Sequence, residues 1–175
     1  MWQRKKFHEC ADELEMVSKS FRTANTNSSG IDQETREEIL EDSSKKGLEL
    51  LKVLALSIRP EQDYDEEFKN ATQDITVGAL KRSASNNEVS DAINSYQSPY
   101  SNRSGFEQLG LREALNKIAH VDRSTTGFFA NDVFHDLILS GKDQKGKTWI
   151  AIVSIVDLCR AVKSLPDQNI PNQAM

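Results

Sequence analysis

The stretch Phe7-His-Glu-Cys-Ala-Asp-Glu-Leu14 begins a helical period that continues into the following residues. The apolar side chains recur at steps of three and four positions, at Phe7, Cys10, Leu14, Val17 and Phe21. Side chains at these steps form one apolar stripe on an α-helix. The pattern predicts an amphipathic helix from about Arg4 to Thr23.

A second, longer helix is expected after the turn-forming residues 25–30. Asp32 is placed to cap its N-terminus, and its first turn is acidic. Its buried stripe is predicted to be Ile39, Ser43, Gly47, Leu50, Leu51, Leu54 and Ile58. The small residues Ser43 and Gly47 would allow another helix to approach closely, and Pro60 is expected to end the helix.

Three further helices are predicted before residue 122. The third follows the stripe of Tyr64, Phe68, Ala71, Ile75, Ala79 and Leu80, and a shorter fourth follows Val89, Ala92, Ile93 and Tyr96. The fifth is expected from about Phe106 to Val121, after the polar loop 98–105.

After Asp122 the apolar residues no longer recur at helical spacing. Residues 133–139 and 148–155 have the composition of two β-strands, and the charged, glycine-containing segment 141–147 joins them as a hairpin. A last helix is predicted on Leu158, Cys159, Val162 and Leu165, with Ser154 or Asp157 as its cap and Pro166 at its end.

These elements predict a mainly α protein, a bundle of about five to six helices with a C-terminal β hairpin at about 133–155. A chain of 175 residues suits one domain, expected over residues 1–165, with a flexible tail at 166–175.

Composition narrows the classes of function. The formal net charge of −5 argues against a broad footprint on a nucleic-acid duplex, so any such binding would need a local basic patch. No apolar run is long enough for a signal peptide or a membrane span, which predicts a cytoplasmic protein without a membrane partner. Cys10 and Cys159 lie in apolar periodic segments, as is typical of buried thiols in a reducing compartment.

The candidate catalytic residues are Arg112, Asn116 and His120, which lie at i, i+4 and i+8 of the expected fifth helix. This spacing places all three on one helical face. An imidazole with an ordinary pKa of about 6.5 suits proton transfer in metal-independent RNA cleavage, and an arginine can stabilise charge growing on the phosphate. The alternative is a structural role, in which His120 interacts with the carbonyls that end the helix and Arg112 is solvated.

The segment Asn116-Lys-Ile-Ala-His120 resembles the motif of the HEPN superfamily, all-helical proteins in which Arg-Asn is followed by three residues and a His. The family's arginine directly precedes the asparagine, whereas Leu115 stands there in this chain and Arg112 lies one turn earlier. The likeness covers about the first 122 residues in architecture and about ten in motif.

The resemblance implies an RNA substrate, no metal, a homodimer with paired motifs, and a place in toxin–antitoxin or antiphage defence. The residues are compatible with two roles. The protein is either a metal-independent endoribonuclease or a catalytically silent relative that binds a partner protein. A non-enzymatic interaction or structural protein is the alternative to both.

No cofactor or metal site is expected. His8 and His135 lie in separate predicted elements, and the three histidines and two cysteines have no recognisable metal-ligand spacing. The lysines and glycines of 141–147 lack the strand, loop and helix order of a phosphate-binding loop, which favours a solvated hairpin tip.

Overall fold

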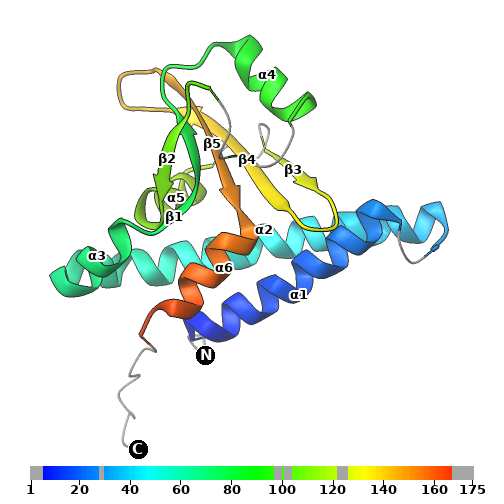
Figure 1. Ribbon diagram of the computed structural model, residues 1–175, viewed down its shortest axis with the longest axis horizontal. Coiled ribbons are helices and arrows are strands. Elements are labelled where there is room, and N and C mark those ends of the chain that lie inside the picture. Colours follow the sequence, from blue (N-terminus) through cyan, green and yellow to red (C-terminus); the bar gives the residue numbers. More distant parts are fainter. Residues whose placement is uncertain (1–5, 28–29, 97–99, 101–103, 122–125, 167–175) are drawn as a thin grey trace, which may run out of the picture.

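The computed structural model describes residues 6–27, 30–96, 100, 104–121 and 126–166 (Figure 1). These residues form helices and strands in the order α1 (Phe7–Thr26), α2 (Gln33–Tyr64), α3 (Glu66–Gln73), β1 (Thr76–Lys81), α4 (Asn86–Asn94), β2 (Glu107–Gly110), α5 (Leu111–Ala119), β3 (Gly127–Ala130), β4 (His135–Lys142), β5 (Thr148–Ser154) and α6 (Ile155–Ser164). The expected tail lies almost entirely outside the described residues.

The strands form one antiparallel sheet in the order β2-β1-β5-β4-β3. The predicted hairpin is confirmed as β4 and β5, in which Leu139 pairs with Ala151. The prediction of a helical bundle with a hairpin alone is wrong, because β1, β2 and β3 extend the hairpin into a five-stranded sheet. The protein is therefore a mixed α/β protein.

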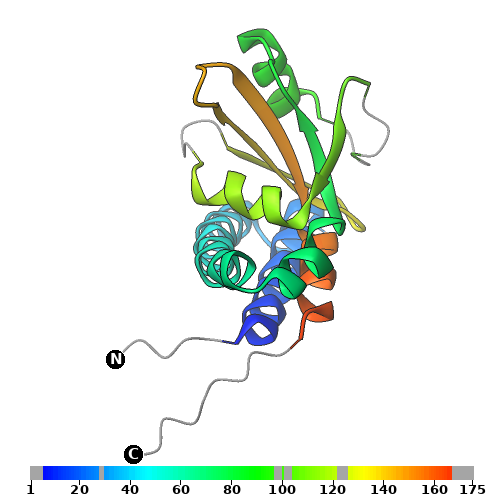
Figure 2. The same ribbon diagram turned by 90° about the vertical axis from the view of Figure 1, so that its left-hand side faces the viewer.

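The two faces of the sheet are covered unequally. Leu137 and Leu139 of β4 belong to the main core with residues of α1, α2, α5 and α6, whereas Ile138 between them belongs to a smaller cluster with Ala92 of α4. Alternation of side chains along a strand places these residues on opposite faces. Figures 1 and 2 show the α1–α2 pair at one end of the molecule and α4 at the other.

The start of α2 and its packing on α1 follow local chemistry. Asp32 Oδ1 accepts a hydrogen bond from the Thr35 backbone N–H at 3.0 Å, so the expected cap is confirmed. Gly47 is buried, and a Cβ added there would lie 3.7 Å from Val17 of α1. The small residues of α2 thus serve packing within one chain.

Pro60 does not end α2, which continues to Tyr64, so that prediction is wrong. A proline inside a helix removes one backbone hydrogen bond. Helix α2 nevertheless keeps its buried face on both sides of this position, since Ile58 and Gln62 are both fully buried. Tertiary packing holds the last turn in place.

The third and fifth predicted helices are partly wrong. Residues 76–81 form the strand β1, in which Val77, Gly78, Ala79 and Leu80 are all buried. The β1–β2 register is irregular between Thr76 and Gly78, and Val77 and Leu80 both belong to the main core. Residues 107–110 form β2, so α5 begins only at Leu111.

The last helix begins as expected. The Ser154 hydroxyl accepts a hydrogen bond from the Asp157 backbone N–H at 3.2 Å and caps α6, which confirms one of the two proposed caps. Cys10 and Cys159 are both buried and carry reduced thiols, as predicted, and burial raises the pKa of Cys159 to about 12. Within the described residues, no helix combines the length and the apolarity needed to cross a bilayer.

Candidate functional site

Helix α5 is fixed at its N-terminus by the backbone. The Leu111 N–H donates to the Ile75 carbonyl at 2.8 Å. Gly110 precedes it, and a Cβ at Gly110 would lie 2.5 Å from the carbonyl oxygen of Gln73. Only a glycine lets the start of α5 approach the end of α3 this closely.

The apolar face of α5 is turned into the core. Its buried residues are Leu111, Ala114, Leu115 and Ile118, which recur at helical spacing. Leu115 is fully buried, so the position at which the HEPN motif has its arginine belongs to the core of this protein. The polar stripe is left on the other side of the helix.

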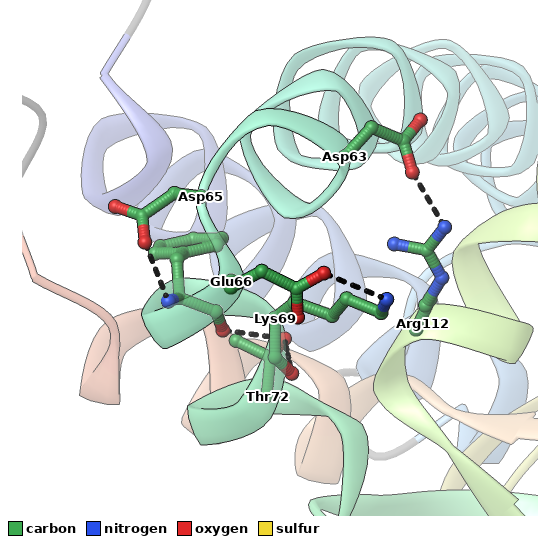
Figure 3. Close-up of polar contacts among 7 residues, drawn as sticks. Asp63, Asp65, Glu66, Lys69, Thr72 and Arg112 are labelled. Carbon is green, nitrogen blue, oxygen red and sulfur yellow. Dashed lines mark hydrogen bonds and ion pairs between the residues drawn. The ribbon is translucent and has the colours of Figure 1, made fainter.

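Arg112 reaches from α5 to the last turns of α2, where its Nη2 donates to Asp63 (Figure 3). Its second terminal nitrogen, Nη1, is buried and has no hydrogen-bond partner among the described residues. A buried guanidinium nitrogen without a partner is uncommon and calls for an acceptor such as a water or an anion.

Arg112 also lines an open groove of about 520 Å³. We call it the α5 groove, and it is formed by residues of four elements: Arg59, Gln73, Gln108, Gly110, Arg112, Glu113 and Asn116. Its volume falls within the range of small-molecule sites in proteins, about 300–1,000 Å³.

The structure brings two of the three predicted site residues together. Asn116 is exposed and lines the α5 groove with Arg112. His120 is not among the lining residues; it is exposed at the C-terminal cap of α5, where its backbone N–H donates to the Lys117 carbonyl at 3.3 Å. Eight residues of helix separate Arg112 from His120, a rise of about 12 Å.

The guanidinium of Arg112 is engaged with another helix, in its ion pair with Asp63 of α2. A single phosphate in contact with Arg112 would therefore lie far from the imidazole of His120 in the same chain. Of the three predicted site residues, Arg112 and Asn116 line the α5 groove, and His120 lies apart from it.

The charges around the groove are balanced in number but unevenly paired. Glu113 accepts hydrogen bonds from Arg82 Nη2, the shorter at 2.9 Å, and Arg82 also pairs with Glu107, whose hydrogen bond raises the pKa of Arg82. Arg112 pairs with Asp63, and Arg59 has no ion pair among the described residues. Arg59 is therefore the lining cation that has no described carboxylate partner of its own.

Sequence reasoning missed most of the groove. Arg59, Gln73 and Gln108 lie on α2, α3 and β2, and tertiary packing alone brings them to α5. No spacing along the chain signals that these residues meet.

The other two histidines have structural positions. His8 Nε2 lies 2.9 Å from the Leu165 carbonyl, and His135 Nδ1 lies 2.8 Å from the Ser18 hydroxyl in the core. Burial and the nearby Arg22 lower the pKa of His135 to about 4. Among the described residues, no three metal-ligating side chains are grouped so that they could hold an ion.

The arrangement is suited to holding an anion by charge-assisted hydrogen bonds and a polar ligand by side-chain amides. No family model, curated protein or solved structure matches the chain. The function proposed below therefore depends on the residues of this protein alone.

Proposed function

We propose that this protein binds RNA through phosphate contacts in the α5 groove and acts as the catalytically silent form of a HEPN-like module. The observation that carries the proposal is the buried Nη1 of Arg112, which has no partner among the described residues and belongs to a side chain that lines the groove. A phosphate oxygen is a strong acceptor for such a nitrogen.

The existing contact of Arg112 does not oppose binding strongly. Its ion pair with Asp63 is partly exposed on both sides, and pairs of this kind stabilise proteins by only about 0–1 kcal/mol. A phosphate can therefore replace Asp63 at low cost, and a turn of the guanidinium would bring the buried Nη1 to it. Arg59 supplies a second cation in the same groove.

Binding is tested by fluorescence anisotropy with a labelled single-stranded RNA, at low and at raised salt. Arg112→Met should weaken binding about tenfold or more, because a charge-assisted hydrogen bond to phosphate is lost. Arg160→Met is the matched control, since Arg160 is an exposed arginine of α6 that pairs with Asp157 in its own helix. Equal affinity of wild type and Arg112→Met would contradict the proposal.

RNA cleavage is the second candidate function, favoured by the exposure of His120 on the helix that lines the groove. If His120 transfers protons, His120→Ala should lower the cleavage rate of a mixed RNA without metal by about 10²–10⁴-fold, whereas Arg112→Ala should act by weakening RNA binding. Both variants should remain folded by thermal unfolding. An inactive wild type would exclude this second function and leave RNA binding as the proposal.

A further inference from the structure

We infer that a halide-sized inorganic anion, such as chloride, is bound between Arg22 of α1 and His135 of β4. The site is independent of the proposed function, because neither residue lines the α5 groove. Two nitrogens carry the inference. Arg22 Nε and His135 Nε2 are both buried, and neither has a hydrogen-bond partner among the described residues. Each can donate an N–H, so a single acceptor would satisfy both.

The two side chains belong to one contact between α1 and the turn that joins β3 to β4 (Figure 1). Arg22 Nη1 donates to the Asp132 carbonyl at 3.0 Å, three residues before His135. Ser18, one turn before Arg22 on α1, has its hydroxyl 2.8 Å from His135 Nδ1. The charge of Arg22 also contributes, after burial, to the lowered pKa of His135. The guanidinium and the imidazole therefore lie in the same part of this interface.

The imidazole of His135 calls for an acceptor rather than a donor. Burial keeps the ring neutral, and a neutral imidazole has one N–H and one accepting nitrogen. The Ser18 hydroxyl can donate to Nδ1, which places the N–H at Nε2. Arg22 has only donors and cannot receive this proton. An anion accepts from both residues.

Arg22 also lacks a counter-charge. Its described hydrogen bond is to a backbone carbonyl, and no carboxylate among the described residues pairs with it. Arg36, which donates to the Ala24 and Asn25 carbonyls at the end of α1, adds a second cation nearby along the helix. A partly buried charge is costly unless it is paired. A bound anion would supply the missing charge together with the missing acceptor.

The surroundings favour a monatomic anion. The rings of Phe21 and Phe128 both lie against the imidazole of His135. A phosphate or sulfate would bury further oxygens against these apolar rings without partners, which is costly. A halide needs about the space of one water and accepts hydrogen bonds from any direction. Water would supply the acceptor but not the negative charge.

The test is thermal unfolding of the full chain at pH 7.5 and constant ionic strength, with sodium gluconate replaced stepwise by sodium chloride. Binding to the folded state alone should raise the Tm of the wild type by about 2–4 °C. Arg22→Met should lose this chloride-dependent rise. Arg36→Met is the matched control, since the described donors of Arg36 are already engaged by carbonyls, and it should keep the rise.

Crystals soaked in sodium bromide locate the ion directly, and an anomalous peak is expected between Arg22 Nε and His135 Nε2. This measurement also decides the matter if Arg22→Met does not fold. Equal Tm values of the wild type in chloride and gluconate, or a water in place of bromide, would overturn the inference. Loss of the rise in Arg36→Met as well would also overturn it, because general attraction to positive charge would then be the cause.

Discussion

The imidazole of His135 is stacked on the ring of Phe21, with centroids 4.7 Å apart and an angle of 9° between the planes. The contact joins β4 to α1 inside the core. Ser18, one turn before Phe21 on α1, holds Nδ1 of the same imidazole. Nε2 is buried and has no partner among the described residues, so the site accommodates a neutral ring and disfavours a charged one.

The stability of the protein should therefore fall as the pH is lowered through the histidine range. The pKa of His135 is about 4 in the folded protein and 6.5 ordinarily, so between these values the unfolded chain binds the additional proton. The stabilisation is complete above pH 6.5 and is lost as the pH falls to about 4, a change on the order of 3 kcal/mol.

Urea unfolding between pH 4.5 and 7.5 measures this dependence. The free energy of unfolding of His135→Gln should vary less steeply with pH than that of the wild type. His120→Gln, which removes an exposed histidine, is the comparison variant. Equal slopes for wild type and His135→Gln would show that another group controls the pH dependence.

Two glycines should respond to alanine in opposite directions. A Cβ at Gly78 of β1 would lie 1.9 Å from the carbonyl oxygen of Ile152 in β5, so Gly78→Ala should destabilise by about 1–3 kcal/mol or more. At Gly47 of α2 the nearest atom is at an ordinary 3.7 Å, and Gly47→Ala should stabilise by about 0.5–1 kcal/mol. Thermal unfolding of both variants tests the pair, and shifts of the same sign would contradict the packing described.

Arg36 should stabilise the turn between α1 and α2. Its Nε donates to the Ala24 carbonyl at 2.7 Å and its Nη2 to the Asn25 carbonyl at 2.9 Å, at the end of α1 where a cation is favoured. Arg36→Met should cost about 1.5–3 kcal/mol of unfolding free energy, as expected for hydrogen bonds to a charged group. Arg59→Met, on the same helix, is the comparison, and an equal loss there would mean that the turn contacts contribute nothing specific.

A homodimer is still predicted from the resemblance to the HEPN family. The small residues of α2 give no separate support for one, because Gly47 packs against Val17 within the chain. Light scattering at micromolar concentration should give twice the chain mass of 19.7 kDa. A mass of one chain would remove the support for paired motifs across a dimer axis.

Local signals in the sequence were sufficient for the elements that depend on local chemistry. Asp32 and Ser154 cap their helices as expected, and strand composition together with a charged, glycine-containing turn located the β4–β5 hairpin. Strand β1 was missed because it is buried on both faces, and a continuous apolar run does not distinguish a central strand from a helix.

The candidate site was predictable only as far as it lies on one helix. Arg112 and Asn116 share a face of α5, and helical geometry alone brings them together. His120 was placed with them by the same spacing, which ignored the rise of about 12 Å along the helix between Arg112 and His120. The remaining lining residues meet α5 through the arrangement of α2, α3 and β2, for which the sequence offers no local pattern.

The position of β5 in the middle of the sheet has a consequence for the order of assembly. Strands β1 and β4 both pair with β5 and not with each other. The two halves of the sheet therefore cannot join until residues 148–154 are available. Contacts between segments so distant along the chain form late and slow folding. During synthesis, the residues that line the α5 groove leave the ribosome well before the strand that completes the sheet beneath them, so the groove becomes a binding surface only once nearly the whole chain has been made.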